Sequence, residues 1–143
     1  MPNSRNRDHR FNGKFKIEIE GVTQGAFLAC DGLEARVDVI DFHDGDDLVA
    51  RKRPGRTRYA NVVLRRGVTV DNALWDWFNA VANGRIERKA GSIILCGDDG
   101  SEIFRYNFFE AWPCRWKSME LDASGPGTLV EHLEMAVERI ERG

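Results

Sequence analysis

Apolar and polar residues alternate along much of the chain, and this alternation predicts short β-strands. Phe15, Ile17 and Ile19 are separated by charged residues, which is the pattern of a strand that buries one of its two faces. The same pattern predicts three further strands, over residues 26–30, 33–39 and 59–66. Asp31-Gly32 indicates a turn between the first two of these, and Gly67 ends the third.

Residues 71–82 carry a helical period. Apolar side chains recur there at positions i, i+3, i+4 and i+7, which places four of them on one stripe: Leu74, Trp77, Phe78 and Val81. Asp71 is a suitable N-terminal cap, and Asn83-Gly84 is a suitable C-terminal end. Trp75 lies off the stripe and predicts a second apolar surface. We therefore expect a helix that is buried along its stripe.

A β-hairpin is expected after the helix. Its strands are predicted over 92–96 and 102–109, with a turn at Asp98-Asp99-Gly100. The chain then continues extended, and Pro113 indicates an edge strand or a bulge. Simple alternation places Trp112 and Trp116 on one face of this segment. It likewise places three aromatic residues on one face of the preceding strand: Phe104, Tyr106 and Phe108.

The segment 128–142 fits two kinds of structure. Four apolar residues have helical spacing, namely Leu129, Leu133, Val137 and Ile140. Thr128 and Glu131 form a capping box, so local propensity favours a helix. Alternate residues from 129 to 137 are also mostly apolar, which fits a strand. With many short strands and a helix elsewhere, the chain is expected to be mainly β (α+β), either a barrel or a sandwich.

Length, composition and charge narrow the class of protein. The chain has 143 residues, of which 42% are hydrophobic, so one domain over residues 13–143 is expected behind a polar, flexible arm of residues 1–12. The net charge of −2 argues against a nucleic-acid binder, which usually has a basic surplus. No run of 18 apolar residues occurs, so no membrane span is expected. Three widely spaced cysteines indicate free thiols in a reducing compartment: Cys30, Cys96 and Cys114.

Residues 41–58 lack apolar periodicity and are expected to form a long, exposed, charged loop with a turn at Pro54-Gly55. Four aspartates come first and five cations follow, so the two signs nearly cancel. Adjacent blocks of opposite sign suit contact with a second copy of the chain better than contact with a polyanion. An exposed loop without a partner and a nucleic-acid patch remain alternatives. The candidate contact residues are Asp44, Asp46, Asp47, Arg51, Lys52, Arg53, Arg56 and Arg58.

Motifs for catalysis or cofactor binding are missing from the sequence. The histidines lie far apart, no cysteine pair has ligand spacing, and Asp44-Gly45-Asp46-Asp47 lacks the later glycine and glutamate of an EF-hand. No nucleophile elbow or phosphate-binding glycine loop occurs. We therefore expect no catalytic, cofactor or metal site. The alternative is a small β-barrel enzyme or ligand-binding module whose site is built from carboxylates distant in sequence.

Four ordered blocks carry a resemblance to a known family. They are RKRPGRTRYANVVLRRGVT over 51–69, LWDWF over 74–78, RKAGSIIL over 88–95 and AWP over 111–113. In this order they closely resemble the tail-tube protein family of contractile phages, which also supplies the inner tube of phage-tail-like extracellular contractile injection systems. The resemblance extends from about Lys14 to Arg142.

The resemblance implies a structural protein that is not an enzyme. The implied fold is that of the hemolysin-coregulated protein of type VI secretion, with two packed antiparallel sheets in a barrel-like sandwich and one flanking helix. Six copies would form a ring, and stacked rings would form a tube that conducts DNA or effector protein when the sheath contracts. The implied partners are the chain itself, the sheath protein, and baseplate and terminator proteins. Assembly is expected in the bacterial cytoplasm, before the tube becomes part of a virion or an injection particle.

Two segments are interpreted differently once the resemblance is taken into account. The loop over 44–58 corresponds to an extended hairpin that reaches neighbouring subunits and the adjacent ring. The segment 129–138 corresponds to a strand, against its local helical propensity.

Overall fold

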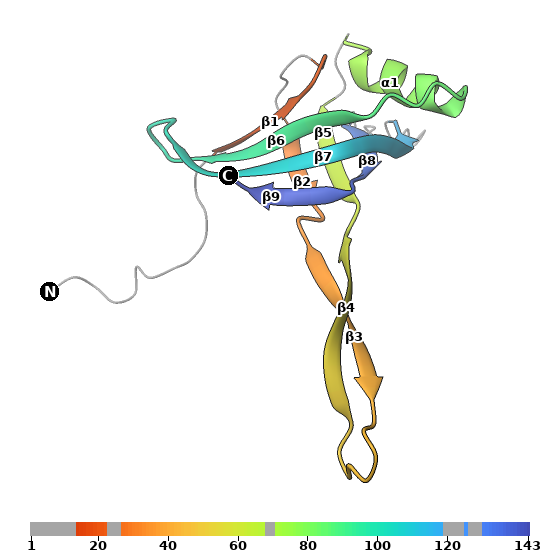
Figure 1. Ribbon diagram of the computed structural model, residues 1–143. Helices are drawn as coiled ribbons and strands as arrows, with labels where there is room; N and C mark the ends of the chain where they lie inside the picture. Colours follow the sequence, from red (N-terminus) through yellow and green to blue (C-terminus); the bar gives the residue numbers. More distant parts are fainter. Residues whose placement is uncertain (1–13, 23–26, 68–70, 119–124, 126–129) are drawn as a thin grey trace, which may run out of the picture.

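Nine strands and one helix make up the described part of the chain, which is residues 14–22, 27–67, 71–118, 125 and 130–143 of this computed structural model (Figure 1). In chain order they are β1 (Lys14–Ile19), β2 (Phe27–Asp31), β3 (Ala35–Phe42), β4 (Arg51–Tyr59), β5 (Val62–Gly67), α1 (Ala73–Ala82), β6 (Lys89–Cys96), β7 (Glu102–Lys117), β8 (Val130–Ala136) and β9 (Arg139–Arg142). The expected arm of residues 1–12 and the capping role of Thr128 lie outside the described residues.

Seven of these strands form one antiparallel sheet that folds into two packed layers. The strand order is β1-β6-β7-β8-β5-β2, and β9 pairs with β7. The front sheet consists of β1, β6, β9 and the first part of β7, and the back sheet consists of β2, β5, β8 and the last part of β7 (Figure 1). β3 and β4 form a separate two-stranded sheet. The predicted fold, mainly β with two packed antiparallel sheets and a flanking helix, is confirmed.

The hydrophobic core lies between the two sheets and under the helix. Its fully buried apolar side chains come from five strands and the helix, and they include Ile17, Ile93, Phe108, Val62, Leu64, Leu133, Met135 and Leu74. The alternation predicted for β1 is confirmed, because Ile17 and Ile19 are buried while Lys16 and Glu20 are exposed. Each such side chain contributes about 1.5–3 kcal/mol when it leaves water.

Helix α1 is buried along its predicted stripe. Leu74 and Trp77 enter the core, and Phe78 and Val81 pack against its margin. The helix ends as expected at Asn83-Gly84, because the left-handed Gly84 (φ 87°) allows its N–H to bond to the Val81 carbonyl at 3.0 Å. At the other end the cap is Asn72 and not Asp71, although an Asp71 carboxylate oxygen accepts a hydrogen bond from Ala73 N at 2.9 Å.

Two irregularities bend β7 and carry it from the front sheet into the back sheet. Glu110 adopts a left-handed conformation (φ 56°) where the pairing with β6 shifts, and a bulge lies between Pro113 and Arg115. The expectation that Trp112 and Trp116 share a face was therefore wrong. Across the bulge Trp112 pairs with Ala136 and Trp116 with Leu133, which are three residues apart and so lie on opposite faces. The bulge predicted for Pro113 is confirmed.

The C-terminal segment is strand and not helix, as the family resemblance implied. β8 lies between β5 and β7, and β9 continues along β7 after a short break. In β8, alternate residues face the core and are buried: Glu131, Leu133 and Met135. Local propensity was overridden because a strand at this place buries apolar side chains and completes hydrogen bonding to two neighbours at once.

A buried ion pair joins the back sheet to the start of the helix. Arg66 and Glu131 are 1% and 7% exposed, and the Arg66 Nε lies 3.2 Å from the Glu131 carboxylate. Arg66 also donates to the Asp71 carbonyl oxygen at 3.4 Å. The second Glu131 oxygen accepts a hydrogen bond from Trp116 Nε1 at 2.8 Å. Both charges are thus satisfied by several partners, which a buried pair requires.

Candidate assembly surface

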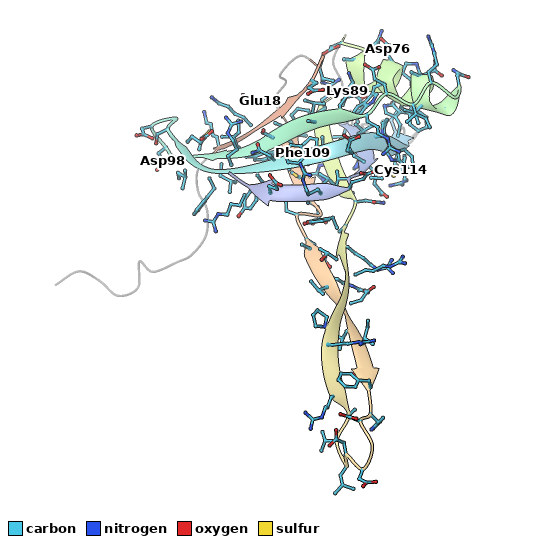
Figure 2. All side chains as sticks on the ribbon, in the orientation of Figure 1. Glu18, Asp76, Lys89, Asp98, Phe109 and Cys114 are labelled. Atoms are coloured by element: carbon cyan, nitrogen blue, oxygen red, sulfur yellow. The ribbon has the colours of Figure 1, made fainter. Side chains whose placement is uncertain are left out.

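A long hairpin projects away from the two sheets. It comprises β3, β4 and the connecting residues 43–50, here called the tip, and Figure 1 shows it as a narrow two-stranded arm directed away from α1. The interpretation of 41–58 as an irregular loop was wrong for most of these residues, because only the tip lies outside the strands. The interpretation from the resemblance, an extended hairpin, is confirmed. Figure 2 shows the side chains of its outer part extending to both sides, with no other described part of the chain beside them, while Ala35 and Tyr59 at its base lie beside Ile140.

Pro54-Gly55 does not form the expected turn and lies inside β4. Val37 pairs with Thr57 and Val39 with Pro54, so Gly55 and Arg56 together face a single residue of β3. This is a β-bulge, where a proline is tolerated because one ladder hydrogen bond is already missing. A side chain at Gly55 would contact Ile40 at 3.1 Å. The bulge therefore explains why both a proline and a glycine occur in the middle of β4.

One face of the hairpin is mainly apolar. The pairs Ala35–Tyr59, Val37–Thr57 and Val39–Pro54 place their side chains on this face by alternation. Val37 is 48% exposed and Val39 is 63% exposed. At the tip, Leu48 is fully exposed and Val49 is 76% exposed. An isolated two-stranded ribbon with so much uncovered apolar surface indicates an interaction site.

The opposite face is rich in arginine. Arg58 donates to Asp38 at 2.8 Å, and Arg51 donates to Asp47 at 2.5 Å; these hydrogen bonds raise the pKa of both guanidinium groups above their usual value. The Arg53 guanidinium lies over the Phe42 ring, 5.6 Å from its centroid. This face therefore remains fully charged at every physiological pH.

All of the predicted contact residues lie on the hairpin, but some of their charges are already paired within it and others are not. Asp44, Asp46 and Asp47 are in the tip, and the five cations are in β4. Two predicted cations pair within the hairpin, as described above, and Lys52 lies 3.9 Å from Asp41. In the part of the chain that the structure describes, Asp44, Asp46 and Arg56 form no ion pair. Arg53 likewise has no carboxylate partner among the described residues and contacts only the Phe42 ring, so these four have charge still available for a second copy.

Sequence reasoning missed the apolar half of this surface. Val37 and Val39 share one face of the strand predicted over 33–39, but alternation alone does not show whether a partner sheet covers that face. Leu48 and Val49 interrupt the charged segment as two adjacent apolar residues. Their position between an acidic and a basic block was the one signal that could have identified them.

Two short connections hold the hairpin on the body. Gly32 adopts φ 96° and its N–H donates to the Asp31 carboxylate at 2.8 Å, while Ala60 N donates to the Glu34 carbonyl at 3.0 Å. A Cβ atom on Gly32 would lie 1.9 Å from the Asn61 carbonyl oxygen. The expected continuous strand over 59–66 is broken here, because the chain leaves the hairpin at Ala60 and Asn61 before it enters β5.

Two of the three cysteines have a raised thiol pKa, and the described residues offer no metal ligand set. Burial, assisted by the Asp31 charge, raises the pKa of the Cys30 thiol to about 12. Burial also raises the pKa of Cys114, with Glu134 adding to the effect. No group of three or more His, Cys, Asp or Glu side chains in the described ranges is arranged to hold a metal ion. None of the described helices is long and apolar enough to cross a bilayer.

The Cys30 thiol is expected to react slowly. At pH 8 it should be alkylated roughly tenfold or more slowly than the same cysteine in unfolded chain, because so little thiolate is present. Mass spectrometry of the Cys30 peptide after timed iodoacetamide treatment measures this rate, and treatment in urea gives the reference. Equal rates in folded and unfolded protein would show that the thiol is not buried.

These features define a class of protein: a β-sandwich subunit whose projecting hairpin is suited to contacts between copies. The chain belongs to the T4-like virus tail tube protein gp19 family, whose model matches residues 12–141. It is a protomer of the inner tube of a contractile tail or injection system, and it is a structural protein, not an enzyme. No curated protein sequence matches it significantly.

Solved structures agree with this assignment. The chain is similar to one in the sheath-tube complex of the extracellular contractile injection system PVC, with 25% identity, a TM-score of 0.82, and coverage of 96% of this chain and 93% of that chain. A chain of the anti-feeding prophage cap has 24% identity and a TM-score of 0.83, with 100% and 99% coverage, and so shares the fold. Hcp1 from Flavobacterium johnsoniae shares it more distantly, with 20% identity, a TM-score of 0.59, and 91% and 94% coverage.

Proposed function

We propose that this tube protomer assembles into six-membered rings that stack, and that the hairpin makes contacts between copies. The observation that supports this most is the hairpin itself, which exposes apolar side chains on one face and at its tip while Asp44, Asp46 and Arg56 form no ion pair with any described residue. A projecting arm of this kind costs conformational freedom and buries little in a monomer. It is stabilised when a second copy covers it.

The proposed contact is head-to-tail. The acidic tip of one hairpin approaches the basic part of β4, or another basic surface, on the next copy, so each protomer both offers and receives a contact. Such heterologous contacts generate rings when the rotation closes and open helical filaments when it does not. Opposite charges also set the relative position of the copies more than they add affinity.

Other partners follow from what the relatives contain. The PVC structures hold a sheath-tube complex and a sheath/tube terminator, and an anti-feeding prophage structure is of its baseplate. We propose corresponding sheath, terminator and baseplate partners for this chain. The tube lumen conducts DNA or effector protein when the sheath contracts. Assembly takes place in the bacterial cytoplasm, and the finished tube is part of a virion or an injection particle.

Charge reversal in the hairpin is expected to weaken assembly while the monomer stays folded. Asp46→Lys or Arg56→Glu should each raise the protein concentration needed for rings or tubes by roughly tenfold or more, because like charges then face each other at every contact. Negative-stain electron microscopy with sedimentation measures the assembled fraction, and circular dichroism reports the fold. Asp98→Lys, in the β6–β7 turn far from the hairpin (Figure 2), is the matched control.

Two results would count against this proposal. Wild-type protein that stays monomeric at high concentration would contradict the tube assembly itself. Normal assembly of both hairpin variants would contradict the hairpin contact, and so would an equal loss of assembly in the Asp98→Lys control.

A further inference from the structure

The connection between α1 and β6 begins with Asn83-Gly84, one of two Asn-Gly pairs in the sequence; the other is Asn12-Gly13. In such a pair the glycine has no Cβ atom to hinder its backbone nitrogen, so this nitrogen can reach the asparagine side chain. Asn83 and Gly84 are both exposed, and each of the residues 85–88 that follow is exposed as well. Water therefore has access to the Asn83 side chain and to the peptide bond after it.

We propose that Asn83-Gly84 is a site of spontaneous deamidation, and that the last turn of α1 controls the rate of this reaction. The Gly84 nitrogen gives up its proton and bonds to the side-chain carbonyl carbon of Asn83, while Nδ2 takes up a proton and leaves as ammonia. One water molecule then opens the five-membered succinimide ring. Cleavage of the bond between the Gly84 nitrogen and the side-chain carbon gives aspartate, and cleavage of the bond to the main-chain carbon gives isoaspartate. This inference does not depend on the proposed ring assembly.

The structure holds the two reacting atoms away from each other. The ring closes only when the Gly84 nitrogen nearly eclipses Cβ of Asn83 about the Cα–C bond. Asn83 has φ −92° and ψ 14°, so the Gly84 nitrogen instead nearly eclipses the backbone nitrogen of Asn83. Because Cα is tetrahedral, Cβ then points well away from the Gly84 nitrogen, and the chain must rotate about Cα–C before the atoms can react.

This rotation breaks the hydrogen bonds that end α1. Gly84 N donates to the Val81 carbonyl at 3.0 Å, and Arg85 N donates to the Ala80 carbonyl at 2.9 Å. Both donors follow the rotating bond and both acceptors precede it, so neither hydrogen bond survives the rotation. The proton on the Gly84 nitrogen is also the one that the reaction must remove. Deamidation therefore requires that the last helical turn opens.

The Asn83 side chain is held by the helix as well. Its Nδ2 donates to the Asn79 carbonyl oxygen at 2.9 Å and to the Asn79 Oδ1 at 3.2 Å. A backbone carbonyl oxygen only accepts hydrogen bonds, so the Asn83 atom that faces it is the amide nitrogen. The leaving group of the reaction thus stays bound to the helix until the turn opens.

Deamidation would weaken the helix end that delays it. An ionised aspartate at position 83 has only acceptor atoms, so it loses both side-chain hydrogen bonds to Asn79. It also places a negative charge at the C-terminus of the helix, where the macrodipole disfavours it. In α1 as the structure describes it, the last turn holds no basic residue that could offset this charge.

The rate of deamidation in folded and unfolded protein tests the proposal. Chain incubated at mildly alkaline pH is digested, and peptide mass spectrometry with chromatography measures aspartate and isoaspartate at position 83. The same chain in urea gives the rate without the helix, with Asn12-Gly13 as a second unfolded Asn-Gly pair. Reaction at Asn83 should be at least roughly tenfold slower in folded protein, because it proceeds from the open state. Equal rates with and without urea, or no reaction at Asn83 in urea, would overturn the proposal.

Amide hydrogen exchange tests whether opening of the last turn is the cause. The Gly84 and Arg85 amides exchange only when the same hydrogen bonds break, so their protection factors should match the slowing of deamidation within about threefold. This comparison needs only the wild-type chain. A larger difference in either direction would show that the two processes do not share an opening step.

Two matched alanine-to-glycine variants separate this end of the helix from the helix as a whole. Ala82 is exposed in the last turn, and Ala82→Gly should speed deamidation at Asn83 roughly threefold or more, because glycine weakens a helix. Ala73→Gly, at the opposite end of α1, should leave the rate within about twofold of wild type. No increase in Ala82→Gly, or an equal increase in both variants, would contradict control by the last turn.

The Asn83→Asp variant tests the effect of the product on the helix end. Its Arg85 amide should exchange about fivefold faster than in wild type, because two hydrogen bonds are lost and an unfavourable charge is added. Unchanged exchange would show that the Asn83 amide does not hold the last turn closed.

Discussion

Replacing Arg66 with methionine is expected to lower the free energy of unfolding by about 3–5 kcal/mol, the usual cost of breaking a buried ion pair. The guanidinium and the Glu131 carboxylate are both buried, so the substitution leaves a carboxylate in the core whose one strong partner among the described residues is Trp116. It also removes the contact with the Asp71 carbonyl and so loosens the start of α1. Urea denaturation followed by tryptophan fluorescence measures the change.

Two variants test whether the loss of stability comes from the unpaired buried carboxylate or from removal of an arginine in general. Arg65, the neighbouring residue, is exposed on β5, and Arg65→Ala should change stability by no more than about 0.5 kcal/mol. Adding Glu131→Gln to Arg66→Met should recover much of the loss, because the amide stays neutral and can still accept the Trp116 hydrogen bond. A double variant as unstable as Arg66→Met would show that packing, not the unpaired carboxylate, accounts for the cost.

Gly32→Ala is expected to destabilise the protein by about 3 kcal/mol or more and to reorient the hairpin. The residue has φ 96°, and the added Cβ would lie 1.9 Å from the backbone oxygen of Asn61, which belongs to the other connection between hairpin and body. Relief of this clash requires the two connections to separate. Thermal denaturation measures the stability, and electron microscopy measures the assembled fraction.

Gly45 provides the control for backbone strain without a clash. It lies in the tip with φ 56°, and a Cβ there would meet nothing within 4 Å. Gly45→Ala should therefore cost only about 1 kcal/mol. If the Gly32 and Gly45 variants are equally stable, the connection between hairpin and body is not a close-packed hinge.

Much of the fold could be predicted from periodicity. In strands and helices that bury a single face, the spacing of apolar residues alone shows which side chains are buried. Ile17 and Ile19 on β1, and Leu74 and Trp77 on α1, lie where their spacing placed them. The segment 130–136 could not be assigned from its own residues, since Leu133 and Val137 fit both periods and the neighbours on β5 and β7 decided the outcome. Only the family resemblance gave the correct answer in advance.

The pattern of charges predicted the charged part of the surface proposed for assembly, but the pattern of apolar residues did not predict its apolar part. The opposite-sign blocks from Asp44 to Arg58 do lie on one exposed element. Val39 escaped notice because an apolar side chain in a strand is usually covered, and Leu48 because it lies within a charged segment. Only the structure shows that nothing in the described chain covers these two. The opposite orientation of the two tryptophans of β7 likewise depends on a bulge, which simple alternation does not register.

β7 also has a mechanical consequence, because it is shared by the front and back sheets. Its hydrogen bonds to β6 and β9 at one end and to β8 at the other run across the strand, so a force along β7 shears them together and does not peel them apart one at a time. The two sheets cannot slide past each other without loading this common strand. Within one protomer, a force along β7 is therefore distributed over both layers.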